Sequence, residues 1–451
     1  MGRASNTKKL GLWMNGAHVG TWSTSPHGHE ELQYSREWVE GEHGRPLSLS
    51  LPILAGGQAL RGEVVRNYFE NLLPDAKQLR ERIARRHQAR STQAFDLLAE
   101  VGRDCVGALQ ILPFGTVPEG VVPVNVTPLS DTAVAALLRN MLAPAPLVQP
   151  EEDDDFRISI AGAQEKTALT FFEGRWCLPH GATPTTHILK LPLGLVGGQQ
   201  VNMRDSVENE WLCAQIIRAY GLPAAECEPL TFDGQKVLSV ARFDRTWWTS
   251  PQGDHRLLRL PQEDMCQATG TPPWLKYEND GGPGMDAIFK LLRSSATREQ
   301  DLLNFFQAQV IFWMLCATDG HAKNFSIFLQ PAGRYRMTPL YDVLSAYPIL
   351  GKKAGQFSPF KVKMAMAFRS TSQHYRMREI LRRHMVAVGE RQGVAGLLGE
   401  SVDKLLDSIA ARTPAVIEAV SAQLPDVFPT YVAETIFQGL TQSAKTLQSV
   451  D

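Results

Sequence analysis

The chain has 451 residues, of which 43% are hydrophobic and 21% are charged, and its formal net charge is −1. A chain of this length exceeds what one hydrophobic core usually serves, so we expect more than one structural lobe. The nearly neutral charge excludes a global attraction to nucleic acid, so that any DNA binding would need a local basic patch or a partner protein.

Cysteine spacing and the N-terminus narrow the class of protein further. The six cysteines lie far apart and form no CxxC pair, which favours reduced core thiols over a disulfide framework or a zinc site. The N-terminus MGRASNTKKL is polar and unlike a signal peptide. No apolar run approaches the ~18 residues of a membrane span. We therefore expect a cytoplasmic protein without a membrane partner.

The first part of the chain, residues 1–150, is expected to form an α/β subdomain followed by a connector. KLGLWMNG is typical of a strand, and the Asn-Gly pair at 15–16 favours a hairpin turn into HVGTWS. RPLSLSLPIL predicts another strand over 47–51, and helical spacing follows over 62–73 and 75–88.

The rest of this part ends in a segment of different composition. DLLAEVGRDCVGALQIL predicts a helix, a glycine-marked turn and a buried strand. Residues 116–155 are rich in Pro and Val and end in the acidic run EEDDD, which is typical of a solvated connector on the surface.

Strand signals dominate the second part, residues 151–270, which we expect to bind the nucleotide. FRISI and KTALTFF flank a turn of small residues at 161–163, and RWCLP, THILKLP, QKVLSVARFD and HRLLRLP predict further strands. SVENEWLCAQIIRAYG has the spacing of an amphipathic helix that Gly221 ends.

The third part, residues 271–451, is predicted to be mostly helical and catalytic, apart from a hairpin over 325–340. A strand-rich segment joined to a larger helical one is an α+β arrangement. The fold class expected for the whole chain is therefore α+β.

The string ATDGHAKNFSIFLQPAGRYRMTPLYD carries the strongest chemical signal. An apolar helix, LLNFFQAQVIFWMLCA, runs into Asp319, Asn324 follows five positions later, and a hairpin then leads to Asp342. Protein kinases need one Asp to orient and deprotonate the acceptor hydroxyl, and an Asn and a second Asp to hold Mg²⁺ against the phosphates of ATP. Carboxylate and amide oxygens suit this hard cation. Taken singly, each residue fits a structural role better, Asp319 in a loop, Asn324 in a turn and Asp342 as a cap, and only the combination favours a kinase.

Two upstream residues strengthen the kinase interpretation. Lys190 lies in the apolar strand THILKLP, where an unpaired ammonium would be costly. A kinase uses such a lysine on the α- and β-phosphates and pairs it with a Glu of the next helix. Glu210 lies on the apolar face of that helix, whereas Glu208 points elsewhere. A lysine at a strand edge with a solvated Glu is the alternative.

Several strings resemble the HipA family of bacterial toxin serine/threonine kinases. ISIAGAQEKTAL, HILKLP, RLPQEDMCQ, ATDGHAKNF and YDVLSAYP resemble its kinase core, and RPLSLSLP, FENLLPD and FDLLAEVGRDCVGA resemble its N-terminal subdomain. The resemblance covers nearly the whole chain. It implies a two-lobed, protein-kinase-like fold with an extra N-terminal α/β subdomain and a mostly helical C-terminal lobe.

The resemblance also implies roles for individual residues. It makes Asp319 catalytic, supported by Lys190 and Glu210, and gives Asn324 and Asp342 to Mg²⁺. Ser159 corresponds to the family's autophosphorylation site, whose modification ejects the phosphate loop and inactivates the enzyme. The residues implied to contact ATP are Ala161, Gly162, Ala163, Gln164, Glu165, Lys166, Lys190, Ala241, Arg242, Phe243, His321, Lys323, Asn324 and Asp342.

One departure from the family concerns the hinge that contacts adenine. The family often has Glu in a VERFDR string, and this chain has Ala241 at that position. A contact through the backbone would survive the change, but a side-chain contact would be lost.

The resemblance further implies partners and a cellular effect. The family's toxin acts on glutamyl-tRNA synthetase, which causes growth arrest and persistence. It is neutralised by HipB, a small helix-turn-helix antitoxin that binds operator DNA. A HipB-like antitoxin, operator DNA through that complex, and glutamyl-tRNA synthetase are therefore the expected partners.

Two other functions share parts of this pattern. A small-molecule phosphotransferase would have the same Asp and Asn arrangement with a different acceptor pocket. A catalytically idle corepressor of a DNA-binding complex would use the chain as a scaffold, although a scaffold has no need for magnesium ligands. The basic string RMREILRRH (376–384) could contact DNA beside a partner, or simply be the solvated face of a helix.

Overall fold

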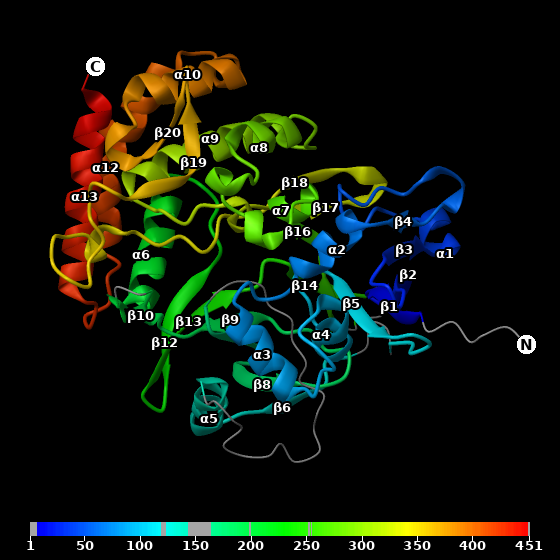
Figure 1. Ribbon diagram of the computed structural model, residues 1–451. Helices are drawn as coiled ribbons and strands as arrows, with labels where there is room; N and C mark the ends of the chain where they lie inside the picture. Colours follow the sequence, from blue (N-terminus) through cyan, green and yellow to red (C-terminus); the bar gives the residue numbers. More distant parts are fainter. Residues whose placement is uncertain are drawn as a thin grey trace, which may run out of the picture.

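The protein has the mixed α+β architecture expected from its sequence, with an N-terminal domain, a central sheet and a large helical lobe (Figure 1). The computed structural model describes residues 7–118, 123–142, 164–197, 200–250, 253 and 255–449. Among these residues, no helix is both long and apolar enough to cross a membrane. The expected strand FRISI, the small-residue turn and the acidic run lie outside the described residues.

The N-terminal domain, blue in Figure 1, is a five-stranded antiparallel sheet covered by helices. Its strands, in the order β4-β3-β2-β1-β5, are β1 (Lys8–Met14), β2 (Ala17–Thr24), β3 (Glu30–Tyr34), β4 (Leu60–Arg61) and β5 (Leu109–Pro113). Its helices are α1 (Arg36–Glu40), α2 (Glu63–Glu70), α3 (Lys77–Arg86) and α4 (Ala94–Val101). Trp22 and Phe69 stack in a core of its own between sheet and helices.

In this domain the sequence predicted one hairpin correctly and one strand wrongly. Asn15 and Gly16 have φ values of 46° and 83°, the left-handed backbone that Asn-Gly adopts in a tight hairpin turn. The strand expected over 47–51 is only an isolated bridge. Ser48 and Ser50 instead donate their hydroxyls to the carbonyl oxygen of Gln267, far along the chain, and this contact competes with pairing in a sheet.

The central sheet has six antiparallel strands in the order β12-β13-β9-β7-β8-β6. They are β6 (Val126–Pro128), β7 (Lys166–Phe172), β8 (Arg175–Pro179), β9 (His187–Lys190), β12 (Cys227–Phe232) and β13 (Gln235–Ala241). Helix α6 (Ser206–Ala219), predicted from its apolar spacing, packs on β12 and β13. Its buried side chains belong to the hydrophobic core of the helical lobe.

Part of the predicted surface connector is in fact structured. Residues 131–142 form α5 (Asp131–Leu142), and Val134, Ala135 and Leu138 are buried against the central sheet. The composition of the whole segment hid this short apolar face, whose spacing is helical. Strand β6 before it adds an edge strand to the sheet.

The helical lobe surrounds α9, which is buried on nearly every side from Phe305 onward. Its helices are α7 (Met265–Ala268), α8 (Met285–Leu292), α9 (Arg298–Met314), α10 (Arg382–Gln392), α11 (Val394–Leu398), α12 (Val402–Ser421) and α13 (Thr430–Gln448). The predicted hairpin is present as β17 (Ser326–Leu329) and β18 (Tyr335–Met337), and β16 (Gln262–Asp264) joins it as a third strand.

Within the described ranges, three short antiparallel pairs lie outside these sheets. They are β10 (Gly194–Val196) with β11 (Val201–Met203), β14 (Arg245–Thr249) with β15 (His255–Arg259), and β19 (Lys363–Arg369) with β20 (Gln373–Arg376). The last pair replaces the helix expected there, because burial of KMAMAFR against α8 and α10 outweighs the helix propensity of Met and Ala. The basic string 376–384 therefore starts in β20 and reaches α10 only at Arg382, so it is no single helix face.

Candidate active site

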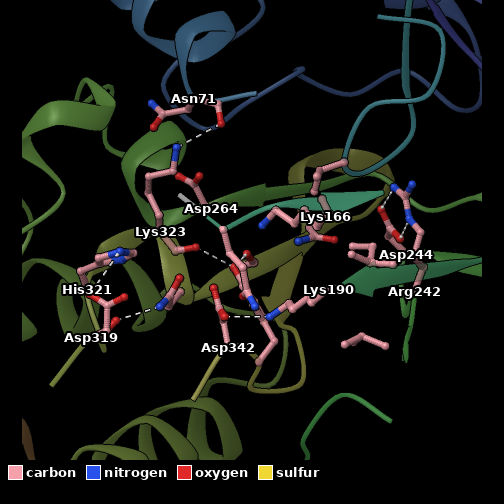
Figure 2. Close-up of a pocket in the computed structure, with 18 of the residues that line it drawn as sticks. Asn71, Lys166, Lys190, Arg242, Asp244, Asp264, Asp319, His321, Lys323 and Asp342 are labelled. Atoms are coloured by element: carbon pink, nitrogen blue, oxygen red, sulfur yellow. Dashed lines mark hydrogen bonds and ion pairs between the residues drawn. The ribbon is translucent and has the colours of Figure 1, made fainter. Parts of the chain in front are cut away.

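One pocket lies where the central sheet, the helical lobe and the N-terminal domain meet, and most of the predicted site residues line it (Figure 2). From the sequence predictions it contains Gln164, Lys166, Lys190, Ala241, Arg242, Phe243, Asp319, His321, Lys323, Asn324 and Asp342. Glu165 and Glu210 are not among the lining residues, and Ser159 and Ala161–Ala163 lie outside the described residues.

Lys190 joins two carboxylates on the sheet side of the pocket. Its ammonium lies 2.6 Å from Glu210 Oε1 and 2.7 Å from Asp342 Oδ1. Strand β9 points Lys190 inward, and the buried face of α6 supplies Glu210, as the sequence predicts. Glu208 pairs instead with Lys236.

These contacts fix the charges of the group. Burial opposes the charge of Lys190, but Asp342 and Glu210 raise the pKa of the ammonium above its usual value. Burial alone would raise the pKa of Asp342, but Lys190 and Lys166 hold it well below its usual range. Burial raises the pKa of Glu210. Asp342 is therefore the more strongly ionised carboxylate, and its φ of 60° is a strained backbone of the kind found at functional sites.

Asp319 lies on the opposite side of the pocket, in the loop that follows α9. The side chain of Asn324 donates to the backbone oxygen of Asp319 at 2.8 Å, and so does the backbone N–H of His321, which closes the loop tightly. The carboxylate of Asp319 is 52% exposed and accepts a hydrogen bond from the Tyr277 hydroxyl. Burial lowers the pKa of His321, whose ring packs edge-on against Tyr277. Asp319 is thus both held and open to an incoming group.

Lys166 is a second lysine near Asp342, at the start of β7 (Figure 2). Burial lowers the pKa of Lys166 to about 8, with Lys190 adding to the effect and Asp342 opposing it. Of the two residues before it, Gln164 lines the pocket and Glu165 does not. Gln164 donates to the Leu191 carbonyl oxygen at 2.5 Å, and Glu165 pairs with Arg82 at 2.8 Å.

The hinge after β13 forms the far wall of the pocket. Ala241 donates its backbone N–H to Glu226, and Arg242 donates its own to Thr186. The guanidinium of Arg242 is buried in ion pairs with Asp104 and Asp244, so this side chain is not directed to a ligand. Phe243 packs its ring 5.8 Å from that of Phe328.

Sequence reasoning missed the contribution of the N-terminal domain. Asn71 and Asp75 reach the pocket from the turn after α2, where Asp75 pairs with Lys276 and Lys323. Tyr277 was also missed. The string FENLLPD contains both Asn71 and Asp75. It indicated the family but no role for these residues, because the lysine partners of Asp75 lie 201 and 248 positions away.

The oxygen donors in the pocket fit Mg²⁺. Asp342 offers a carboxylate that is 28% exposed, and Asn324 offers an amide. This cation binds proteins through one or two such side chains and fills its shell with water and phosphate oxygens. Within the described ranges, there is no group of three or more His, Cys, Asp or Glu residues that could bind a metal ion.

Comparison with known proteins gives two family matches that together span most of the chain. Residues 158–417 match the HipA-like C-terminal domain, and residues 10–112 match the HipA N-terminal domain. The second range contains Asn71 and Asp75 of the pocket, and the first range contains the other lining residues named above.

Individual proteins give the same result. The chain is 36% identical to "Putative kinase Y4mE" of Sinorhizobium fredii, covering 76% of this chain and 79% of that one. It is 26% identical to the serine/threonine-protein kinase toxin HipA of Shewanella oneidensis, covering 74% and 72%. A Shewanella oneidensis HipA structure, solved with HipB and operator DNA, matches the fold with a TM-score of 0.74, 24% identity and coverage of 97% and 96%. The chain belongs to the HipA family.

Proposed function

We propose that this protein is an ATP-dependent serine/threonine protein kinase that transfers the γ-phosphate to a protein acceptor. The observation that carries the proposal is the grouping of Lys190, Glu210 and Asp342 across one pocket from Asp319 and Asn324. Relatives named as kinases support it.

Each residue has a role that its surroundings support. Lys190, fixed by Glu210, binds the α- and β-phosphates as an ammonium. Asp319 is open enough to accept the proton of a serine or threonine hydroxyl as that oxygen attacks the γ-phosphorus. The bond from the γ-phosphorus to the bridging oxygen of the β-phosphate then breaks and ADP leaves. Asp342 and Asn324 would hold Mg²⁺, which when bound neutralises charge on the phosphates.

The acceptor, the partners and the cellular effect are further parts of the proposal. By resemblance the acceptor is glutamyl-tRNA synthetase and the effect is growth arrest with persistence. Its relative in Shewanella oneidensis is named a toxin, and a HipA from that organism was solved with HipB and operator DNA. We therefore propose a HipB-like antitoxin as the neutralising partner, and operator DNA as a partner through that complex. Growth on expression of the chain, with and without such a protein, tests this part.

Ser159 is proposed to be a self-inhibiting phosphorylation site. It lies outside the described residues, so its warrant is the sequence: it precedes the turn 161–163 by two positions. A phosphate there would add about −1.5 to −2 charges beside the phosphates of ATP. The predicted result is one phosphate per chain at Ser159 and then loss of ATP binding.

Incubation of the purified protein with labelled ATP and Mg²⁺, followed by mapping of phosphorylated residues, tests the kinase proposal. Transfer to serine or threonine is expected. In Asp319→Asn it should fall by roughly 100-fold or more, because catalysis here is positioning and electrostatics. ATP binding and circular dichroism should not change. Phosphate transfer to a metabolite alone would favour a small-molecule phosphotransferase, and no transfer at all would favour a corepressor.

A further inference from the structure

The N-terminal domain supplies one carboxylate to the wall of the active-site pocket. Asp75 lies in the turn between α2 and α3, and its side chain is 17% exposed. Its Oδ1 lies 3.0 Å from the ammonium of Lys323, and its Oδ2 lies 2.8 Å from that of Lys276. Lys323 also donates to the backbone oxygen of Asn71 at 3.2 Å, a contact drawn in Figure 2.

The two lysines belong to the two segments that enclose Asp319. Lys323 is in the catalytic loop, between His321 and Asn324. Lys276 directly precedes Tyr277, whose hydroxyl donates to the Asp319 carboxylate. The two segments also meet directly, because the backbone N–H of Ala322 donates to the oxygen of Lys276 at 3.2 Å. The carboxylate of Asp75, from the N-terminal domain, therefore links the two segments that enclose Asp319.

The charge that makes this tie is permanent at physiological pH. Burial raises the pKa of Asp75, but Lys323 and Lys276 outweigh it and lower the value to about 2. A neutral side chain of the same shape would leave two ammonium groups close together without their shared counter-charge.

The domain that carries Asp75 is itself fastened to the segment leading to Tyr277. Asn67 and Asn71, at the end of α2, donate to the backbone oxygens of Gly270 and Thr271, both at 2.9 Å. The backbone N–H of Leu49 donates to the buried Glu263 at 2.9 Å. Asp75 thus acts from a fixed support.

We propose that Asp75 is a positioning residue of the active site, which sets the catalytic loop through Lys323 and the Tyr277 segment through Lys276. The N-terminal domain is then an integral part of the catalytic centre. This inference rests on the proposed kinase function for its kinetic consequence, but its structural consequence can be measured without any activity.

The test compares Asp75→Asn with Asp96→Asn in the full-length protein. Asp96 is in the same domain, pairs with Lys8 at 2.7 Å and has a similarly buried side chain (14% exposed), but it does not line the pocket. Amide hydrogen exchange over 276–278 and 319–324 should speed up in Asp75→Asn and stay as in the wild type in Asp96→Asn. Unchanged exchange in both variants would overturn the proposal.

Kinetics give the second readout. Asp75→Asn should lower kcat by about 10- to 100-fold, since small displacements of catalytic groups have effects of this size. KM for ATP should change less than kcat, because Lys190 and its partners lie across the pocket from the loop that Asp75 sets. Lys276→Met should lower kcat alike, and the double variant should be no slower than Asp75→Asn. Equal effects of Asp75→Asn and Asp96→Asn on kcat, or additive losses in the double variant, would contradict the proposal. A wild-type protein without transfer would refute the kinase function, and the exchange rates would still decide the role of Asp75.

Discussion

One cluster of buried charge includes Arg242 of the hinge and another surrounds Lys190, and the two differ in how their charges are shared. In the arginine cluster, Arg242, Arg245 and Arg259 hold Asp104 and Asp244, with nitrogen–oxygen distances of 2.8–3.1 Å. In the lysine cluster, Lys190 pairs with both Glu210 and Asp342.

The arginine cluster is closed. Its side chains are 2–8% exposed, and spare guanidinium N–H groups donate to backbone oxygens of Cys105, Gly107 and Ala182. The lysine cluster is open, since Asp342 is 28% exposed and two carboxylates share one ammonium. Both clusters shift pKa values strongly, so a shifted pKa by itself does not identify a site. A carboxylate identifies a candidate site better when it faces a cavity and its oxygens can still accept further ligands.

Breaking the closed cluster should have the largest effect, and on folding. Asp104→Asn removes the carboxylate shared by three guanidiniums, which are then buried without sufficient counter-charge. We expect a loss of about 3–5 kcal/mol in the free energy of unfolding. Denaturant unfolding measures it. Asp96→Asn is the control, because its partner Lys8 is 43% exposed and such a pair is worth about 0–1 kcal/mol. If the two variants lose a similar free energy of unfolding, the arginine cluster does not stabilise the fold more than an ordinary ion pair does.

Breaking the open cluster should act on ATP use more than on folding. Lys190→Met should lower kcat/KM for ATP by roughly 100-fold or more, the effect of losing a preorganised group that binds phosphate charge. Its melting temperature should fall less than that of Asp104→Asn, because Glu210 can take up a proton.

The pH dependence of the Lys190→Met variant follows from Glu210. Burial already raises the pKa of Glu210 in the folded state above its unfolded value, and loss of the ammonium raises it further. The folded state then binds the proton more tightly, so the unfolding free energy should increase as the pH falls through that pKa. Thermal melts between pH 8 and pH 5, taken as rough limits around the raised pKa, measure the slope. A flat profile would mean that Glu210 stays ionised.

Lys166 offers a smaller and reversible way to weaken the same side of the pocket. Its pKa of about 8 means that the ammonium proposed to attract the phosphates of ATP is present below that pH and lost above it. The kcat/KM for ATP should therefore fall as the pH rises through about 8, by at most about tenfold per pH unit. In Lys166→Arg, which keeps its charge, the profile should be flat there. A decline of the same size in both proteins would assign it to another group.

Residues whose environment is local were predictable from the sequence. The Asn15–Gly16 hairpin follows from backbone preference, and the Lys190–Glu210 pair follows from a buried strand and the apolar face of the next helix. Helix α5 and the β19–β20 hairpin were missed, because burial against distant elements decides their structure. Contacts between domains were missed for the same reason, because they also depend on residues far apart in the sequence.

The pair Asp75–Lys276 shows the limit most clearly. Its residues are 201 positions apart, and neither lies in a pattern that names the other. Tyr277 was equally invisible, since a tyrosine in a polar loop has no periodicity to interpret. Asp319, the proposed catalytic residue, was identified from its own string, but its contact with Tyr277 arises only from the fold.

The smallest expected effect concerns Tyr277, whose hydroxyl contacts Asp319. In the proposed mechanism the acceptor hydroxyl must reach the Asp319 carboxylate, and the Tyr277 hydroxyl donates to its Oδ1. A carboxylate accepts hydrogen bonds at both oxygens, so Oδ2 stays open to the acceptor while Tyr277 orients the group. This hydrogen bond is worth about 1 kcal/mol. Tyr277→Phe keeps the ring that packs edge-on against His321 and removes only the hydroxyl. The kcat should fall by roughly two- to fivefold, with KM for ATP unchanged. Steady-state kinetics with the acceptor varied at saturating ATP measure this. A lower acceptor KM at constant kcat would instead mean that the hydroxyl competes with the acceptor for Asp319.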